Sequence, residues 1–505
     1  MRKLIFVTFF LLFTTILFTQ SASFANAQSW RDKVDGWVLE TAVPDTNAAA
    51  STKTYPQTEF LVQLTEQADL SGAEALLTKE EKGRYVYEQL TAVANRTQPA
   101  VIAELERLGV TYKPFWVANM IWVEGDIYAV QAMALRDDVA HLYANPTVTQ
   151  AIEPPAVQPL ETSGIWDSIG FVGAKDVWAL GYRGQGVVIG GQDTGYEWDH
   201  PALIDAYRGW DGDAADHNYS WHDAWRDTFP CSVDEPCDDH SHGTHTMGTM
   251  VGNVNEIGMA PDAQWIGCRN MHSGNGTPAS YTDCYQWFIA PTDLNDLNPD
   301  FSKAPDVINN SWGCPPSEGC NPDSLATVVA AVRAAGIVTV HSAGNDGPSC
   351  GSSSTPGTIY DQSFSVGATG ENTNQIAGFS SRGPITVDGS NRMKPDISAP
   401  GVNIYSSVLN DGYGVKSGTS MAAPHVAGMV ALILSARPDL KGNVHAIEEV
   451  IQDTAVKLTT TQGCGSDTAT SIPNNVYGYG RIDAQQALFL LTAEYRYYWP
   501  VVLKE

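Results

Sequence analysis

The sequence predicts an α/β fold with a doubly wound, mostly parallel sheet, preceded by a small α+β domain with a ferredoxin-like order of elements. Residues 164–490 alternate apolar strand-like runs with helical runs, as a parallel sheet requires. Residues 55–148 follow the order β-α-β-β-α-β. The proline-rich stretch 153–159 continues neither a helix nor a strand, so it separates the two regions. A chain of 505 residues also exceeds what one hydrophobic core usually serves.

Each element of the small domain has a recognisable period. Residues 59–64 alternate like a half-buried strand, whereas residues 79–108 have helical spacing and good helix formers. Two strand-like runs, a helical run and a last short strand follow at Tyr112–Ala118, Met120–Val123, Ile127–Leu135 and Val139–Tyr143. The domain contains no cysteine and no reactive constellation, so by itself it indicates a fold and no activity.

In the large domain, short apolar runs mark the strands of the parallel sheet. Examples are Gly186–Gln192, Ala263–Ile266, Asp306–Asn309 and Gly336–His341. In such a sheet, reactive residues gather at the carboxyl ends of strands and the amino ends of helices. Asp193 and Asn345 each follow an apolar run, and Ser420 opens a helix-like segment, Met421–Ala436.

Three strings far apart in the chain carry the residue types that activate a serine nucleophile. They are Asp193–Gly195 (DTG), His242–His245 (HGTH) and Gly418–Pro424 (GTSMAAP). A serine attacks as its proton passes to an imidazole, while a carboxylate fixes the tautomer of that imidazole and stabilises the imidazolium. The chain order Asp, His, Ser is the subtilisin order, distinct from that of chymotrypsin and of the α/β-hydrolases.

With four further strings, these motifs make residues 164–490 resemble the subtilisin-like serine proteases, or subtilases. The further strings are Asn309–Gly313, Ser342–Asn345, Phe379–Pro384 and Lys394–Gly401. The resemblance implies a subtilisin-like peptidase domain, and the preceding unit resembles the inhibitory propeptide of the family. The cysteine-containing loops resemble the branch that includes the bacillopeptidase F-like enzymes.

The resemblance implies four catalytic roles. Ser420 is the nucleophile at a helix amino terminus, which favours developing negative charge. His242 is the general base and then the acid, since its reference pKa of about 6.5 suits proton transfer near neutral pH. Asp193 orients the histidine, and Asn345 donates its amide to the oxyanion. The simpler interpretations are a helix-capping serine for Ser420 and a turn residue for Asn345.

Other residues of the same types compete for these roles. His245 lies one helical turn after His242, and the resemblance favours His242 as the base and a structural role for His245. Asp199 and Asp239 compete by residue type with the aspartate that ends the apolar run. We interpret His425 as a packing residue.

Two segments are expected to bind the peptide substrate. They are Ser311, Trp312 and Gly313 on one side, and Ser342, Ala343 and Gly344 on the other. The first segment is expected to pair with an extended peptide as an added strand, which gives backbone contacts that are largely blind to sequence. Trp312 and the second segment would border the pocket for the residue before the scissile bond, and the small residues there favour a large apolar side chain.

The amino-terminal residues predict export. Arg2 and Lys3 precede an apolar run, residues 4–18, and Ala25–Ala27 fits a small-residue cleavage site, so residues 1–27 are expected to be a signal peptide of a secreted, extracellular protein. The apolar run is shorter than the roughly 20 residues that cross a bilayer. We expect no later stretch to be apolar enough to span one.

The sequence also predicts a precursor. Residues 28–160, with an inhibitor-like domain at about 55–148, are expected to be a propeptide that folds and inhibits the peptidase domain and is removed by self-cleavage between Thr147 and Gly164. Residues 491–505 form a carboxyl-terminal tail that is aromatic and apolar, with no role assigned.

Eight cysteines, all after residue 230, fit disulfides in an oxidising compartment. Eight cysteines formally allow 105 pairings. Close spacing favours Cys231–Cys237, Cys268–Cys284 and Cys314–Cys320, which leaves Cys350 with Cys464. A zinc site is disfavoured because no CxxC pair or regular Cys/His spacing is present.

The formal charge of −28 argues against nucleic-acid binding, which needs basic patches. The expected partners are protein or peptide substrates and the protein's own propeptide as an intramolecular inhibitor. No membrane partner is expected, and the protein is expected to be a monomer.

Residues 210–239 form an acidic, aromatic-rich insertion between the Asp and His strings. Its members are Asp211, Asp213, Asp216, Asp223 and Asp227 with Trp221 and Trp225. We favour a solvated, disulfide-held loop over calcium or substrate binding. Residues 251–258 are shorter than the calcium loop of typical subtilisins, so no metal ligands are assigned and structural calcium stays open. Catalysis is expected to need no cofactor.

The main hypothesis is therefore an endopeptidase that acts through an acyl-enzyme. One rival is a catalytically inactive binding or adhesion protein on the same fold, which the four catalytic residues argue against. Another is a sedolisin-like acid peptidase with a glutamate base, which His242 and Asn345 disfavour.

Overall fold

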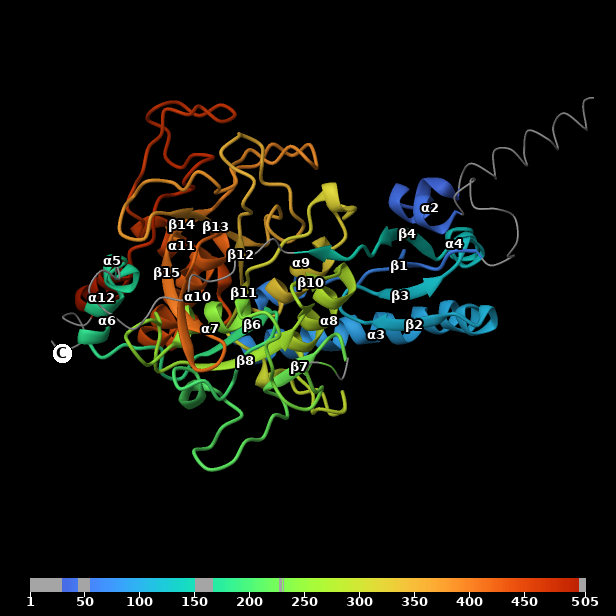
Figure 1. The fold of residues 1–505 in the computed structure, drawn as a ribbon, viewed down its shortest axis with the longest axis horizontal. Helices are drawn as coiled ribbons and strands as arrows, with labels where there is room; N and C mark the ends of the chain where they lie inside the picture. The colour runs from blue at the N-terminus through green and yellow to red at the C-terminus, as the bar shows by residue number, and fades with distance from the viewer. Residues whose placement is uncertain (1–29, 44–54, 150–166, 227–228, 230, 499–505) are drawn as a thin grey trace, which may run out of the picture. The chain divides into compact units, whose positions relative to one another are not determined.

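A computed structural model describes residues 30–43, 55–149, 167–226, 229 and 231–498. The expected signal peptide and nearly all of the expected cleavage segment lie outside the described residues. The chain divides into two compact units (Figure 1). Unit 1 comprises residues 1–67 and 92–145, and unit 2 comprises residues 68–91 and 146–505. The long helix α3, Lys79–Leu108, contributes to both units.

Unit 1 is built on a four-stranded antiparallel sheet in the order β2-β3-β1-β4. Its elements are β1 Thr58–Leu64, β2 Thr111–Phe115, β3 Met120–Gly125, α4 Ile127–Ala134 and β4 Val139–Ala144, with α3 between β1 and β2. The predicted β-α-β-β-α-β order is confirmed. One helix, α2 at Gly36–Ala42, was not predicted, and it packs Val38 and Ala42 into the core of this unit.

Unit 2 is built on a seven-stranded sheet in the order β14-β13-β12-β11-β6-β8-β7, and every neighbouring pair is parallel. The strands are β6 Val188–Asp193, β7 Trp221–Asp223, β8 Gln264–Arg269, β11 Val307–Asn310, β12 Val338–Ser342, β13 Phe364–Thr369 and β14 Ile397–Pro400. The strands are almost wholly buried, which is typical of a parallel sheet covered on both faces. The predicted fold class is confirmed.

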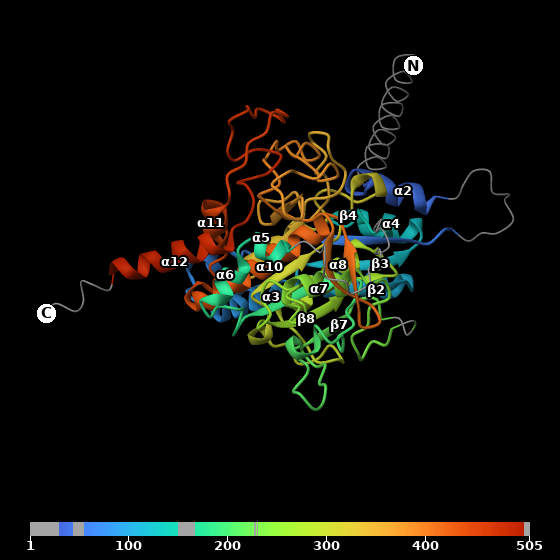
Figure 2. The ribbon, with the colours of Figure 1, turned by 60° about the vertical axis from the view of Figure 1, so that its left-hand side comes forward.

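Helices cover both faces of this sheet (Figures 1 and 2). α7 His242–Val251 and α10 Thr419–Ala436 pack on each other, and α8 Pro278–Ile289 and α9 Ala326–Ala334 form the second pair. Along the chain α7 lies between β7 and β8, α8 between β8 and β11, and α9 between β11 and β12.

The remaining elements are short or lie at the rim of unit 2. They are α5 Ser168–Phe171, α6 Ala174–Ala179, α11 Val444–Thr454, α12 Ala484–Tyr498, β5 Val148–Thr149, β9 Met271–His272, β10 Asn275–Gly276, β15 Ile404–Val408 and β16 Gly412–Lys416. Single turns of 3-10 helix lie at Arg31–Lys33, Ser71–Ala75, Ile204–Ala206, Phe301–Lys303, Pro316–Glu318 and Pro438–Leu440.

Helix α10 is the one described helix that is long and apolar enough to cross a membrane by length and composition. The expectation that no later stretch would be so apolar is therefore wrong. Of this 18-residue segment 89% is buried inside the protein, where α10 packs on α7 and on five strands of the sheet. Its apolar character thus comes from its place in the core.

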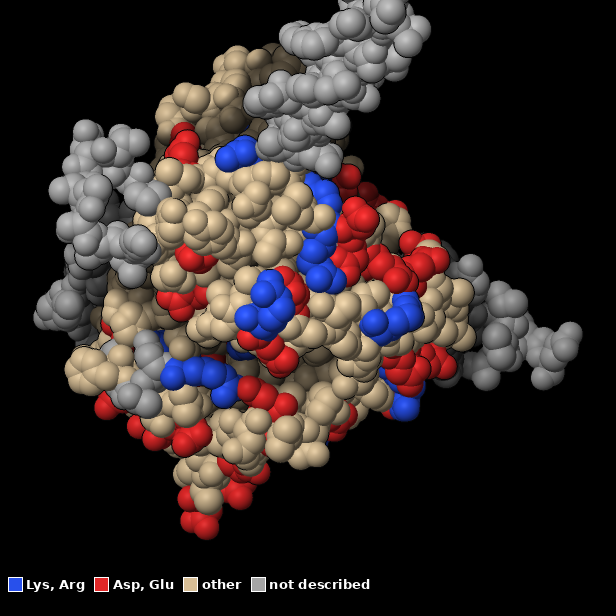
Figure 3. All heavy atoms as spheres, turned by 90° about the vertical axis from the view of Figure 1, so that its right-hand side faces the viewer, with Lys and Arg blue, Asp and Glu red and all other residues tan. Residues whose placement is uncertain are grey.

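Acidic side chains are spread over the face of the molecule drawn in Figure 3, with basic side chains among them. This distribution accompanies the formal charge of −28. A high net charge of one sign keeps protein molecules apart in solution and does not determine the fold.

The four predicted disulfides are present in the structure. They are Cys231–Cys237, Cys268–Cys284, Cys314–Cys320 and Cys350–Cys464. Three of them close short loops, whereas the last closes a loop with a sequence separation of 114 residues.

The long disulfide should stabilise the protein more than the short ones. In the chain-entropy view, the loop of Cys350–Cys464 restricts the unfolded chain by about 5 kcal/mol, against about 2 kcal/mol for the six-residue separation of Cys231–Cys237. Urea unfolding of C350S/C464S and C231S/C237S should show this order. Equal losses would contradict it.

Candidate active site

The site lies where two central strands of unit 2 end. β6 and β11 are parallel neighbours, and Gln192 is in register with Asn310. Asp193, the last residue of β6, and Ser311, the residue after β11, are therefore next to each other at the carboxyl edge. Neighbouring strands lie about 4.8 Å apart, so side chains from these two ends share one small region.

The Asp193 carboxylate holds the imidazole of His242. Asp193 Oδ1 lies 2.6 Å from His242 Nδ1, and both side chains are buried. The same oxygen accepts from the Thr194 backbone N–H, and the other accepts from Thr246 Oγ1. Because Nδ1 faces a carboxylate, it carries the proton, and Nε2 is the nitrogen that can accept one.

Two glycines of the motif strings allow the segments to approach closely. A Cβ on Gly243 would collide with the carbonyl oxygen of Gly195, and a Cβ on Gly195 would collide with the carbonyl oxygen of Cys237. Gly195 also has a φ of +105°, which side-chain-bearing residues rarely adopt. Glycine is therefore required in the DTG and HGTH strings because the segments that bring Asp193 to His242 pack too closely to leave room for a side chain.

Ser420 lies in the first turn of α10, next to the end of β11. Its hydroxyl donates to the Ser311 carbonyl at 3.1 Å, and its own carbonyl accepts from Ser311 Oγ at 2.8 Å. The backbone of α10 therefore begins at the same edge that carries Asp193. The helix amino terminus places partial positive charge at the serine.

The Asn345 side chain has a fixed orientation. Its Oδ1 accepts from the Thr419 backbone N–H and from Thr419 Oγ1, both at 2.9 Å. The amide nitrogen therefore points the other way, and it lies 3.6 Å from the point that a Cβ on Gly418, two residues before Ser420, would occupy. Asn345 is exposed, so its amide can donate to a bound group beside Ser420.

The rival residues are placed differently. Asp199 is exposed, and Asp239 faces Arg269. His245 bonds the Ile404 carbonyl through Nε2 at 2.9 Å, and burial holds its pKa well below the usual range. His425 lies between the Met421 carbonyl and Ser168 Oγ, and burial lowers its pKa to about 4. Among these residues, only His242 has the aspartate of the DTG string as its partner.

Asp238 is a buried carboxylate that the sequence analysis did not single out. Its Oδ1 accepts from Thr194 Oγ1 and from the backbone N–H groups of His240 and Ser241, and its Oδ2 accepts from the N–H and Oγ1 of Thr244. It thereby fixes the start of α7 and the DTG turn to each other. An acidic residue before the first turn of a predicted helix is the signal that could have identified it.

Lys416 is a second residue that the sequence analysis missed. It ends β16, four residues before Ser420, and it is buried. Its Nζ has no hydrogen-bond partner among the described residues. Burial lowers the pKa of the ammonium, against the opposing fields of the Asp238 and Asp193 carboxylates.

The predicted substrate-binding residues lie along the same edge. Trp312 is buried and stacks on Tyr281 with ring centroids 3.8 Å apart, so its indole forms a wall and not a free surface group. The Ser342 to Gly344 segment follows β12, and the Gly344 backbone N–H donates to Thr419 Oγ1 at 3.2 Å.

A second edge suited to an extended peptide was not predicted. β9 and β10 form a hairpin, and β10 pairs antiparallel with β5, with Asn275 opposite Thr149 and Gly276 opposite Val148. The turn-forming residues Ser273–Gly276 are the sequence signal that could have identified this hairpin. An extended segment of the chain thus occupies the outer edge of β10.

The acidic insertion is not wholly the solvated loop that the sequence predicts. Trp221–Asp223 forms β7, the edge strand of the main sheet, and its side chains are buried. The Asp223 carboxylate faces the buried Arg269 guanidinium at 3.0 Å. Asp211, in contrast, is exposed and closes its own turn through the N–H groups of Asp213 and Ala214.

Within the described ranges, no group of three His, Cys, Asp or Glu side chains is arranged to hold a metal ion.

A buried Asp–His pair beside a serine at a helix amino terminus, on a doubly wound parallel sheet, defines the class of serine-type hydrolases. The Subtilase family model matches residues 184–480. The chain belongs to the subtilase family.

Relatives in Bacillus are similar over most of the peptidase region. Bacillopeptidase F of Bacillus subtilis (strain 168) is 39% identical over 349 residues, which cover 66% of this chain and 22% of that protein. Serine protease AprX of the same strain is 33% identical over 282 residues, 50% of this chain and 59% of AprX. Subtilisin E of that strain is 33% identical over 365 residues, 69% of this chain and 78% of subtilisin E. The match thus spans about a fifth of bacillopeptidase F, and the predicted resemblance to that branch is confirmed.

Buried neutral histidines should make the fold sensitive to acid. Burial lowers the pKa of His425 to about 4 and that of His341 to about 3, whereas an unfolded histidine titrates near about 6.5. The unfolded state binds more protons between these values, so stability falls as the pH falls below about 6.5. Between pH 7 and pH 5, each histidine should contribute a loss of about 2 kcal/mol.

A variant His425→Gln should remove one of these contributions. In a Ser420→Ala background, the loss of unfolding free energy between pH 7 and pH 5 should be smaller by about 2 kcal/mol, measured by urea unfolding at each pH. The comparison is between two pH values of one variant, so a change in baseline stability does not affect it. An unchanged acid slope would contradict the prediction.

Proposed function

We propose that the protein is a secreted serine endopeptidase that hydrolyses peptide bonds through an acyl-enzyme, with Asp193, His242 and Ser420 as the triad. The observation that carries the proposal is the buried 2.6 Å contact between Asp193 and His242 at the strand end beside Ser420. Membership of the subtilase family supports it.

The chemistry follows from the orientation of each group. The Ser420 hydroxyl donates to the Ser311 carbonyl, and for attack its proton has to pass to His242 Nε2. His242 takes the proton as Ser420 Oγ bonds to the substrate carbonyl carbon, and Asp193 stabilises the imidazolium. The same proton then passes to the leaving amine, and water repeats the sequence on the acyl-enzyme.

Asn345 would stabilise the oxyanion. Because Thr419 holds Asn345 Oδ1, the amide N–H is directed away from Thr419 and toward the space beside Gly418. A preorganised donor of this kind acts on charge that develops in the transition state, and the α10 amino terminus adds to it.

Asn345→Ala should therefore lower kcat with little change in KM. The expected loss is about 10²- to 10³-fold, the value measured for the same kind of donor in a subtilisin. Hydrolysis of a peptide anilide measures it, and Asn295→Ala, at an exposed turn outside the left-handed region, is a matched control. A loss that appears in KM alone would contradict the oxyanion role.

Labelling by an organophosphonate at neutral pH tests the whole proposal, because only an activated serine reacts under these conditions. The wild-type chain should be labelled at Ser420, and His242→Ala should not be labelled. An unlabelled wild-type protein would favour an inactive binding protein or a sedolisin-like acid peptidase.

Residues 28–160 would be an inhibitory propeptide. The pairing of β5, at Val148–Thr149, with the edge of β10 supports this, since it places the last described residues before the expected cleavage segment on an edge suited to an extended peptide. The beginning of α3, within unit 2, offers a second contact, because Lys79 Nζ donates to the buried Asp306 carboxylate at 2.9 Å. Four disulfides support an oxidising, extracellular location.

Self-processing makes one clear prediction. Ser420→Ala, expressed as the full chain, should accumulate as an unprocessed precursor, whereas the wild type should lose its amino-terminal region. Mass spectrometry of the intact protein distinguishes the two forms. Normal maturation of the Ser420→Ala variant would refute self-cleavage and leave the endopeptidase proposal standing.

A further inference from the structure

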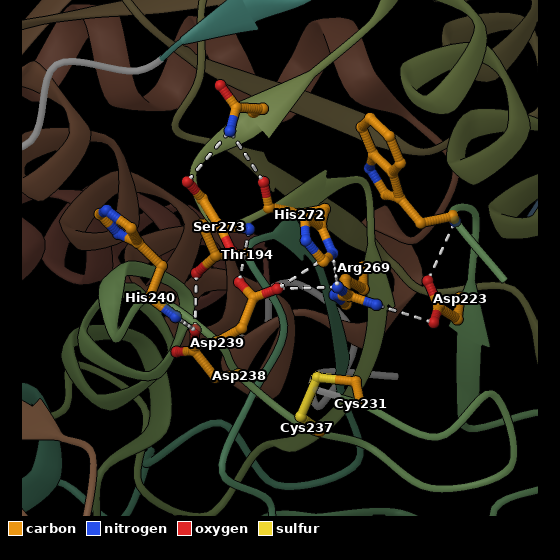
Figure 4. A network of polar contacts seen from close by, with 12 residues as sticks. Thr194, Asp223, Cys231, Cys237, Asp238, Asp239, His240, Arg269, His272 and Ser273 are labelled. Atoms are coloured by element: carbon orange, nitrogen blue, oxygen red, sulfur yellow. Dashed lines mark hydrogen bonds and ion pairs between the residues drawn. A yellow bond between two sulfur atoms is a disulfide. The ribbon is translucent and has the colours of Figure 1, made fainter. Parts of the chain in front are cut away.

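A buried arginine connects the acidic insertion to the β9–β10 hairpin (Figure 4). Arg269 ends β8, and its side chain is fully buried. Its Nη1 donates to Asp223 Oδ2 at 3.0 Å, and its Nη2 donates to Asp239 Oδ2 at 2.7 Å. Asp223 belongs to β7 of the insertion, and Asp239 lies three residues before His242. One guanidinium thus joins segments that the sequence separates.

The same network extends into the hairpin. Arg269 Nη2 also donates to His272 Nδ1 at 2.7 Å, and because arginine has no acceptor, that nitrogen of His272 is the acceptor. Asp239 Oδ1 accepts from the Ser273 backbone N–H at 2.8 Å. Figure 4 shows Asp239 between Ser273 and Arg269, with the Cys231–Cys237 disulfide nearby. Two consecutive residues of the hairpin are therefore tied to the network, one through its side chain and one through its backbone.

The backbone of the hairpin turn needs such support. Ser273 and Gly274 join β9 to β10 with φ values of +49° and +77°, the left-handed region that a tight two-residue turn uses. Glycine adopts this conformation without cost, but serine does so rarely. The hydrogen bond from the Ser273 N–H to the Asp239 carboxylate holds the strained residue in place.

The turn sets the position of the edge that binds an extended chain. Asn275 and Gly276 of β10 follow the turn directly and pair with Thr149 and Val148 of β5. Backbone pairing along an edge depends on the register of that edge, and a shift of one residue reverses the faces of every side chain. Whatever holds Ser273 in place therefore holds the register in which a peptide pairs with β10.

We propose that Arg269 and Asp239, the last residue of the acidic insertion, are positioning residues for extended peptide substrates, and that Asp223 of the insertion supports Arg269. The proposal rests on the proposed function. It assigns the insertion a role in substrate binding through the hairpin. Neither Asp239 nor Arg269 is proposed to contact the reacting atoms. Its consequence is a dependence on substrate length, because only a peptide long enough to reach β10 uses this edge.

Asp239→Asn tests the proposal, since it keeps the size of the side chain and removes the charge. The full chain is expressed, and active sites are counted with an organophosphonate. For a substrate with four residues before the scissile bond, kcat/KM should fall by about tenfold or more, mainly through KM, as the charged hydrogen bonds are lost. For a substrate with a single acylated residue, kcat/KM should change by less than about twofold.

Two further variants separate positioning from general instability. Glu448→Gln breaks another bidentate pair, the less deeply buried Arg333–Glu448, which belongs to α9 and α11, and it should leave the ratio of kcat/KM values for the long and short substrates unchanged. Asp239→Asn combined with Ser273→Gly should recover part of the ratio, because glycine adopts the turn without the carboxylate.

The outcomes decide the proposal. Equal losses on both substrates in Asp239→Asn, or the same change of ratio in Glu448→Gln, would overturn it. If Asp239→Asn does not fold, His272→Ala serves instead, since His272 is partly exposed and alanine lacks the acceptor that His272 offers to Arg269. Its ratio should fall in the same direction, and an unchanged ratio would also overturn the proposal. Activity on the short substrate in every variant keeps the proposed function separate from this test.

Discussion

The register between β6 and β11 is the constraint on which the site depends. Parallel strands end at the same edge, and the pairing of Gln192 with Asn310 puts Asp193 beside Ser311. Ser311 in turn fixes the first turn of α10 through two hydrogen bonds with Ser420. A slip of one residue would turn Asp193 to the other face of the sheet and away from α7. The proposed catalytic arrangement thus depends first on the register of the sheet and only then on the loops.

Buried carboxylates at this edge are stable because each has several hydrogen-bond donors. Removing a carboxylate from water costs more free energy than a single hydrogen-bond donor recovers, so a buried carboxylate requires several donors. Asp238 accepts from five donors, which belong to Thr194, His240, Ser241 and Thr244. Asp193 accepts from His242 Nδ1, from the Thr194 N–H and from Thr246 Oγ1. The threonines of the DTG string and of the first turns of α7 are therefore structural donors to these two carboxylates.

The sequence was sufficient for the parts of the structure that depend on local pattern. The strand before Asp193 and the helix after Ser420 follow from short apolar runs and their period, and both occur where the pattern predicts them. The residues that support the site could not be predicted in this way. Arg269 is separated in sequence from its partner Asp223 by 46 residues and from its partner Asp239 by 30. The residues around each of the three do not indicate which residues it contacts. β7, with three residues in an acidic stretch, is too short to show a period.

Charge balance connects Lys416 to the chemistry. An ammonium buried without a hydrogen-bond partner among the described residues is costly by itself, and the fields of Asp193 and Asp238 offset that cost. With His242 neutral, the two carboxylates and one ammonium carry a net charge of −1. In the proposed mechanism His242 takes the serine proton, and the same group of four then becomes neutral. The fixed charges of Asp193, Asp238 and Lys416 together therefore stabilise the imidazolium that accompanies the tetrahedral intermediate. These charged groups are already in place, so none of them has to move during the reaction.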